Sequence, residues 1–256
     1  MFIASSPGDS PLSEDGQQTS HPKVVLLDAV GTVIQPFPSV AATYQEVGRL
    51  HGIELDQASI RSRFHAAIKR FSVHAFQQSR NLADPLKTDE VSERLRWQAI
   101  VDYVLSPTPQ QKCLVFESLW DHFAHPENWR LFDDVLPTLD FLVERGFRLG
   151  LASNFDQRLR RIAEFYFSDY PLELFVSSEV GWVKPAKQFY AEVTRRLGLS
   201  PNQILLIGDD WENDVKAPQK FGWQTVYLDR DGGPDGVGKS NGHNTLEDAV
   251  DRLFPN

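Results

Sequence analysis

The sequence predicts an α/β fold in which a doubly wound, Rossmann-like parallel sheet forms the core and carries an inserted all-helical cap domain. Three observations support this prediction. A short apolar strand lies at residues 24–27, residues 37–127 show helical periodicity alone, and from residue 129 onward helical and strand patterns alternate. Repeated helix–strand alternation indicates a parallel sheet with helices on both of its faces.

The start of the chain divides into a tail and a strand. Residues 1–22 are rich in Ser, Pro, Gly and acidic residues and contain little to bury, so we expect a flexible tail there. The segment KVVLLDAV follows, and such a continuous apolar run is typical of a parallel strand that is covered on both faces. We therefore assign residues 23–36 to the core domain.

Residues 37–127 are predicted to form the helical cap. Apolar side chains recur there at the spacing of a buried helix face, and they include Val40, Tyr44, Val47, Ile60, Phe64, Ala67 and Phe71. The same spacing leads us to interpret Phe64, Phe71, Trp97 and Trp120 as core residues of the cap.

Residues 128–256 are predicted to complete the core. Strand patterns lie in FRLGLAS, LFVSS, ILLIGDD and QTVYLD, and helical patterns such as QRLRRIAEFY, AKQFYAEVTRRLG and NDVKAPQKFG separate them. In an open sheet of this kind, ligands bind beyond the carboxyl ends of the strands. Those ends are where a functional site is expected.

Composition argues against several classes of function. The chain has 256 residues and a net charge of −9, which disfavours nucleic acid as a partner because phosphate backbones require a basic surface. No apolar run approaches the roughly 18 residues that span a bilayer, so we expect no membrane association. The single cysteine, Cys113, is compatible with a reducing compartment, and we expect a cytoplasmic protein. The oligomeric state cannot be inferred from these features.

Polar side chains follow four of the predicted strands. In chain order they are Asp28, Ser153, Asn154, Lys184, Asp209 and Asp214. A carboxylate can act as a covalent nucleophile. A hydroxyl and an ammonium can hold a phosphoryl group, and carboxylate oxygens are ligands that Mg²⁺ prefers.

These motifs, in this order and on these elements, resemble those of the haloacid dehalogenase superfamily of hydrolases, in the subfamily with a helical cap after the first motif. More narrowly, FAHPENWRLFDDVLPTL, ASNFDQRL and SSEVGWVKPAKQFY are similar to the subgroup of haloacid dehalogenase-like hydrolase domain-containing protein 3 and rhythmically expressed protein 2. The resemblance implies an Mg²⁺-dependent phosphatase that acts on a small phosphorylated metabolite through an aspartyl-phosphate.

The resemblance also implies a role for each site residue. Asp28 attacks phosphorus, and Lys184 binds the phosphoryl oxygens and offsets the crowding of carboxylates. Ser153, Asn154 and Thr32 complete the phosphate-binding set, with Thr32 using its hydroxyl or its backbone amide.

Magnesium, by the same resemblance, lies between Asp28, Asp209 and the main-chain carbonyl of Val30, with Asp214 supporting the metal. Val30 itself departs from the family pattern, because phosphatases place there an aspartate that protonates the leaving oxygen and then activates water. Such acid–base help is worth roughly 10²–10⁴-fold. Valine cannot supply it, although its backbone carbonyl remains a metal ligand.

Three interpretations of Val30 stay open. The chain is a phosphatase whose substrate has a good leaving group or that borrows an acid, or a catalytically impaired protein that binds phosphate and metal. The third interpretation is a dehalogenase- or phosphonatase-type hydrolase, since those enzymes also lack the second aspartate. Tyr190 falls where we expect a tyrosine in dehalogenases, but the acids of GDDWEND, which dehalogenases replace, are kept.

Overall fold

The computed structural model describes residues 21–80, 83–230 and 242–254. The predicted tail lies outside the described residues except for its last two positions, residues 21–22. Among the described residues, no helix combines the length and the apolar character needed to cross a membrane.

A five-stranded sheet with the order β5-β4-β1-β6-β7 forms the centre of the molecule, and its neighbouring strands are all parallel. The strands are β1 (Val24–Leu27), β4 (Arg148–Ser153), β5 (Leu172–Val176), β6 (Ile204–Gly208) and β7 (Gln224–Tyr227). In the register, Leu27 pairs with both Leu151 and Ile207, so the ends of three strands meet at one edge. Because β1 is the middle strand, the residue that follows it lies at the centre of that edge.

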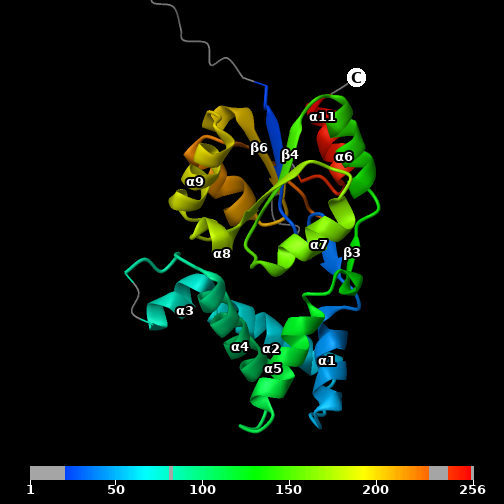
Figure 1. The fold of residues 1–256 in the computed structure, drawn as a ribbon, viewed down its shortest axis with the longest axis vertical. Coiled ribbons are helices and arrows are strands. Elements are labelled where there is room, and N and C mark those ends of the chain that lie inside the picture. The colour runs from blue at the N-terminus through cyan, green and yellow to red at the C-terminus, as the bar shows by residue number, and fades with distance from the viewer. Residues whose placement is uncertain (1–20, 81–82, 231–241, 255–256) are drawn as a thin grey trace, which may run out of the picture.

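Helices cover both faces of this sheet (Figure 1), which confirms the predicted doubly wound core. One face packs against α6 (Val135–Glu144), α7 (Arg158–Phe167) and α11 (Leu246–Leu253). The other packs against α8 (Ser177–Val180), α9 (Lys187–Leu197), the π-helix η3 (Trp211–Lys216) and α10 (Ala217–Phe221). The side chains of β1 alternate between the two faces, and all four are buried.

Five helices form the described part of the cap, which Figure 1 shows as a separate layer below the sheet. They are α1 (Val40–Leu50), α2 (Gln57–Arg70), α3 (Val73–Ser79), α4 (Glu90–Leu105) and α5 (Lys112–His122). Their apolar faces share a core of their own that includes Tyr44, Ile60 and Leu119. The inserted helical cap predicted from periodicity is therefore present.

Two short strands that the sequence analysis missed join the cap to the core. Strand β2 (Ile34–Pro36) pairs antiparallel with β3 (Trp129–Leu131), and a single turn of 3₁₀ helix, η1 (Pro126–Asn128), precedes β3. Each strand has only three residues, too few for an alternating pattern to be recognised. Another 3₁₀ turn, η2 (Pro201–Gln203), leads into β6.

The segment before α4 also contacts the core directly. The backbone amide of Thr88 donates to the carbonyl of Gly181 at 3.1 Å, and that of Val183 donates to Leu86 at 3.0 Å. The cap is thus held to the core at a second place, opposite the β2–β3 connection.

One predicted strand ends earlier than expected. LFVSS was predicted as a strand, but β5 ends at Val176 and its two serines begin α8. The Ser177 hydroxyl donates to the carbonyl of Phe155 at 3.0 Å, so a hydrogen bond from a side chain takes the place of backbone pairing between strands there.

Candidate active site

Asp28 lies at the centre of the site, directly after β1. Its backbone amide donates to the carbonyl of Ile207 at 2.9 Å, which prolongs the sheet by one residue, and its side chain is 13% exposed. The chain then turns sharply at Gly31, whose φ is +89°. A Cβ atom at Gly31 would lie 2.3 Å from Oδ2 of Asp209, so only glycine leaves room for that carboxylate.

Three carboxylates converge beyond the strand ends. Asp28, Asp209 and Asp214 each offer an oxygen, and these oxygens lie within 4.8 Å of one another. Asp209 follows β6, whereas Asp214 comes from η3 and is fully buried. Gly208 makes this approach possible, because a Cβ there would lie 2.3 Å from Oδ2 of Asp214.

Lys184 joins two of these carboxylates. Its ammonium donates to Oδ1 of Asp28 at 2.7 Å, to Oδ1 of Asp214 at 2.6 Å and to the carbonyl of Ala152 at 2.7 Å. The side chain is buried, and three acceptors satisfy its three N–H groups. Asn154 fixes the backbone of Lys184 from both sides, accepting from its amide at 2.7 Å and donating to its carbonyl at 2.8 Å.

Burial and mutual repulsion shift the pKa values of this cluster. Burial and the charge of Asp28 raise the pKa of Asp209 to about 6. Burial also raises the pKa of Asp214 to about 7, against the opposing effect of Lys184. Burial alone lowers the pKa of Lys184, but the charges of Asp214 and Asp28 outweigh it and raise that pKa, so the ammonium stays protonated. Clustered oxygen donors whose ionisation is held back by burial fit a hard divalent cation such as Mg²⁺.

The remaining sequence-predicted residues occupy the same edge of the sheet. Ser153 ends β4 and is buried. Thr32 is fully buried, and its hydroxyl donates to Oδ1 of Asp209 at 2.9 Å, while its amide contacts the carbonyl of Ala29 at 3.3 Å. Asp210 caps η3 by accepting from two backbone amides, as expected of an acid in a first helical turn.

Tyr190 packs in the core beside this cluster, close enough that, besides burial, the charges of Lys184 and Asp214 act on the pKa of its hydroxyl. It is buried against Phe189, Phe221 and Trp223, and its hydroxyl donates to the carbonyl of Asn213 at 2.6 Å. It therefore has the position of a core residue, with its polar end satisfied by the backbone.

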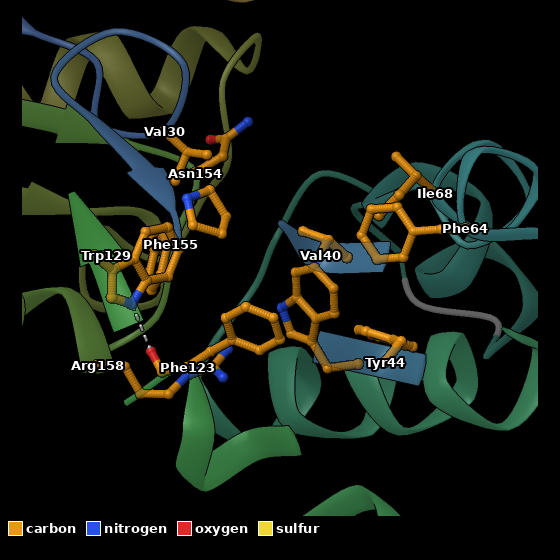
Figure 2. A pocket seen from close by; sticks show the side chains of 12 residues that line it. Val30, Val40, Tyr44, Phe64, Ile68, Phe123, Trp129, Asn154, Phe155 and Arg158 are labelled. Carbon is orange, nitrogen blue, oxygen red and sulfur yellow. Dashed lines mark hydrogen bonds between the residues drawn. The ribbon is translucent and has the colours of Figure 1, made fainter. Parts of the chain in front are cut away.

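A cavity of about 360 Å³ opens between the cap and the core, next to the strand ends. Its described lining is Val30, Pro36, Val40, Tyr44, Phe64, Ile68, Trp97, Phe123, Trp129, Asn154, Phe155 and Arg158. Figure 2 shows Val30 and Asn154 on the core side, facing Phe64 and Ile68 across the space. Val30, 36% exposed, connects this cavity with the loop of Asp28.

Sequence reasoning missed this cavity. Phe64 and Trp97 were interpreted as core residues of the cap, and they do pack against its core, but both also line the cavity. Arg158 was not singled out at all. A helix face directed at a cavity has the same periodicity as one directed at a core, so the apolar spacing contained no signal that separates the two.

Comparison with known proteins places the chain among hydrolases. The model of the haloacid dehalogenase-like hydrolase family matches residues 22–222. An uncharacterised hydrolase of Schizosaccharomyces pombe is 26% identical over 218 residues, covering 81% of this chain and 90% of its own length. Human haloacid dehalogenase-like hydrolase domain-containing protein 3 is 24% identical over 211 residues, covering 80% of this chain and 81% of its own.

A relative of named activity matches a shorter part of the chain. Glyceraldehyde 3-phosphate phosphatase of Methanopyrus kandleri is 34% identical over 104 residues, which are 39% of this chain and 43% of that protein.

Solved structures with this fold include both phosphatases and dehalogenases. The defluorinating L-2-haloacid dehalogenase Rha0230 has a TM-score of 0.70 at 18% identity, covering 91% of this chain and 95% of its own. A phosphatase from Thermococcus onnurineus has a TM-score of 0.60 at 20% identity, covering 90% of this chain and 97% of its own. The fold by itself thus does not choose between the two activities.

Proposed function

We infer the reaction from the premise that the chain belongs to the haloacid dehalogenase-like hydrolase family, and we propose that it is an Mg²⁺-dependent phosphatase. The observation that supports this proposal best is the set of three converging carboxylates with Lys184 bound to two of them. A cluster this acidic repels an anionic substrate unless a cation offsets it, and phosphoryl transfer uses such a cation.

In the proposed reaction, a carboxylate oxygen of Asp28 attacks phosphorus. The bond between phosphorus and the leaving oxygen breaks, and that oxygen departs with the electron pair. The result is an aspartyl-phosphate. Water then attacks the phosphorus, the bond to Asp28 breaks, and inorganic phosphate is released with the proton of the water passing to a phosphate oxygen or to solvent.

The other residues prepare this reaction. Lys184 neutralises Asp28 and Asp214, and Asn154 holds the lysine backbone in place. We propose that Lys184 also binds the phosphoryl oxygens. Thr32 orients the carboxylate of Asp209 through its hydroxyl.

Asp28, Asp209 and Asp214, with the backbone carbonyl of Val30, are the groups that we propose hold Mg²⁺. When bound, the ion would offset negative charge on the phosphoryl group. The named phosphatase relative supports a small phosphorylated metabolite as the substrate.

Two alternatives follow from Val30, which contributes no proton. A protein that binds phosphate and metal with little turnover is the first. Dehalogenase-type chemistry is the second, and the carboxylate cluster disfavours it, because this chain keeps the acids of GDDWEND that dehalogenases replace.

Phosphate release tests the proposal. A panel of phosphorylated metabolites and an aryl phosphate is assayed with Mg²⁺ and with chelator, beside an Asp28→Asn control. We expect release that requires both Mg²⁺ and Asp28. Metal binding without release supports the binding protein instead, and halide release from a 2-haloacid in chelator supports the dehalogenase.

A further inference from the structure

We propose that the cavity between cap and core holds the leaving group, and that this group is an aromatic ring joined to an oxygen that departs without a proton. The substrate class is then an aryl phosphate or an aroyl phosphate. This inference rests on the proposed function and specifies the substrate of that same site.

The walls of the cavity match an aromatic ring. Aromatic side chains come from the cap and from the core, and those that line it are Tyr44, Phe64, Trp97, Phe123, Trp129 and Phe155. Several already pack on one another: the rings of Phe64 and Trp97 are stacked with centroids 6.4 Å apart, and Tyr44 meets Phe64 edge-on at 5.5 Å. A ring inserted here gains both apolar burial and the preferred ring geometries.

The one charged side chain among the described lining residues is already paired. Arg158 donates to both carboxylate oxygens of Asp156 at 2.7 Å and to the carbonyl of Trp120 at 3.3 Å, and its guanidinium lies 3.6 Å from the centroid of the Trp120 ring. Asp156 is itself buried. The guanidinium therefore stabilises the cavity wall, and polar groups on the part of the leaving group that lies inside the cavity, away from the departing oxygen, find little to pair with.

Val30 connects this cavity to the reaction. It lies two residues after Asp28 and contributes to the cavity wall, and none of the described lining residues is acidic. A phenolate or carboxylate leaving group tolerates this surface because it is weakly basic and departs without protonation. The valine at position 30, where phosphatases have aspartate, thus removes the acid and also extends the apolar wall to the scissile bond.

Two acyl phosphates isolate the contribution of the ring. Acetyl phosphate and benzoyl phosphate both release a carboxylate, so neither requires an acid, and they differ in a methyl group against a phenyl ring. We measure Mg²⁺-dependent phosphate release from each and subtract the Asp28→Asn rate. We expect kcat/KM for benzoyl phosphate to exceed that for acetyl phosphate by at least about tenfold, because the ring is buried.

A matched pair of cap variants locates the effect. Ile68 lines the cavity and is 38% exposed, whereas Leu95 is 41% exposed and lies outside the lining. Ile68→Asn should lower the benzoyl-to-acetyl ratio, and Leu95→Asn should leave it unchanged.

The outcomes separate the two proposals. Asp28-dependent release with equal rates, or with acetyl phosphate preferred, overturns the aromatic substrate and leaves the phosphatase standing. An unchanged ratio in Ile68→Asn places the ring elsewhere and also overturns the inference. No Asp28-dependent release from either compound, or from the wider panel, overturns the phosphatase and with it the substrate class.

Discussion

Nζ of Lys184 lies 2.7 Å from Oδ1 of Asp28, although the two residues are 156 positions apart in the chain. The ammonium also contacts Asp214 at 2.6 Å, so one buried cation holds together the proposed nucleophile and a proposed metal-associated carboxylate. The stability of the site and its reactivity therefore depend on the same group.

Lys184→Met is expected to destabilise the protein strongly. Removing one member of a buried ion pair leaves its partners uncompensated, a loss of about 3–5 kcal/mol in the free energy of unfolding. Denaturant unfolding measures it, with Lys187→Met on the exposed surface of α9 as the control. Equal stability of the two variants would show that the carboxylates do not depend on Lys184.

Val30→Asp is expected to raise phosphatase turnover. The new carboxylate supplies the missing proton, which is worth roughly 10²–10⁴-fold for a strongly basic leaving group and much less for a weakly basic one. Rates for an alkyl phosphate and for a nitrophenyl phosphate give the comparison. An unchanged alkyl phosphate rate counts against the view that proton transfer is what the wild type lacks.

Gly31→Ala is expected to disturb the metal site. The new Cβ meets Oδ2 of Asp209 at 2.3 Å, and the backbone has a φ of +89°. Gly146→Ala is a matched control, because its φ of +79° brings similar strain but nothing lies within 4 Å of the new atom. Calorimetric titration with Mg²⁺ should show weaker binding in Gly31→Ala alone, and an equal loss in both variants would contradict the geometry.

Stability should depend on pH and on Mg²⁺ together. The pKa values of Asp209 and Asp214 are raised from 3.8 to about 6 and about 7. In the metal-free protein, the contribution of these two carboxyl groups to the free energy of unfolding is therefore fully present below about pH 4. It is lost as the pH rises through 6 and 7, where the buried carboxyl groups must ionise.

Because Mg²⁺ offsets that charge and competes with protons, the increase in melting temperature that it causes should be larger near pH 8 than near pH 5.5. Thermal scans with Mg²⁺ and with chelator measure this difference. Asp214→Asn should reduce the increase at the higher pH. An equal increase at both pH values argues against carboxylate ligands.

The position of the candidate site could be predicted from the sequence because the geometry of a parallel sheet is simple. Asp28, Lys184, Asp209 and Asp214 follow or lie near the carboxyl ends of strands, and parallel pairing brings those ends to one edge whatever the details of packing. The glycines beside the carboxylates are also consistent with such a site, although only the tertiary structure shows which atom each one accommodates.

Roles that depend on an individual neighbour could not be predicted in this way. The hydroxyl of Thr32 donates to Asp209, and Asn154 fixes the backbone of Lys184. The phosphate-binding roles expected of both residues stay predictions. Both residues lie at the predicted edge. Their partners follow from side-chain directions in the loops, which strand periodicity does not describe.

The sequence by itself determined the α/β core, the inserted helices and the absence of an acid at Val30, because strand and helix periodicities and residue identities are local properties. Only the tertiary structure decided what surrounds Val30: a cavity whose aromatic walls come from both cap and core, with Arg158 paired to Asp156. The physical reason is that these contacts join residues far apart in the chain. They exist only once the cap has docked on the sheet, and no pattern in either segment encodes that docking.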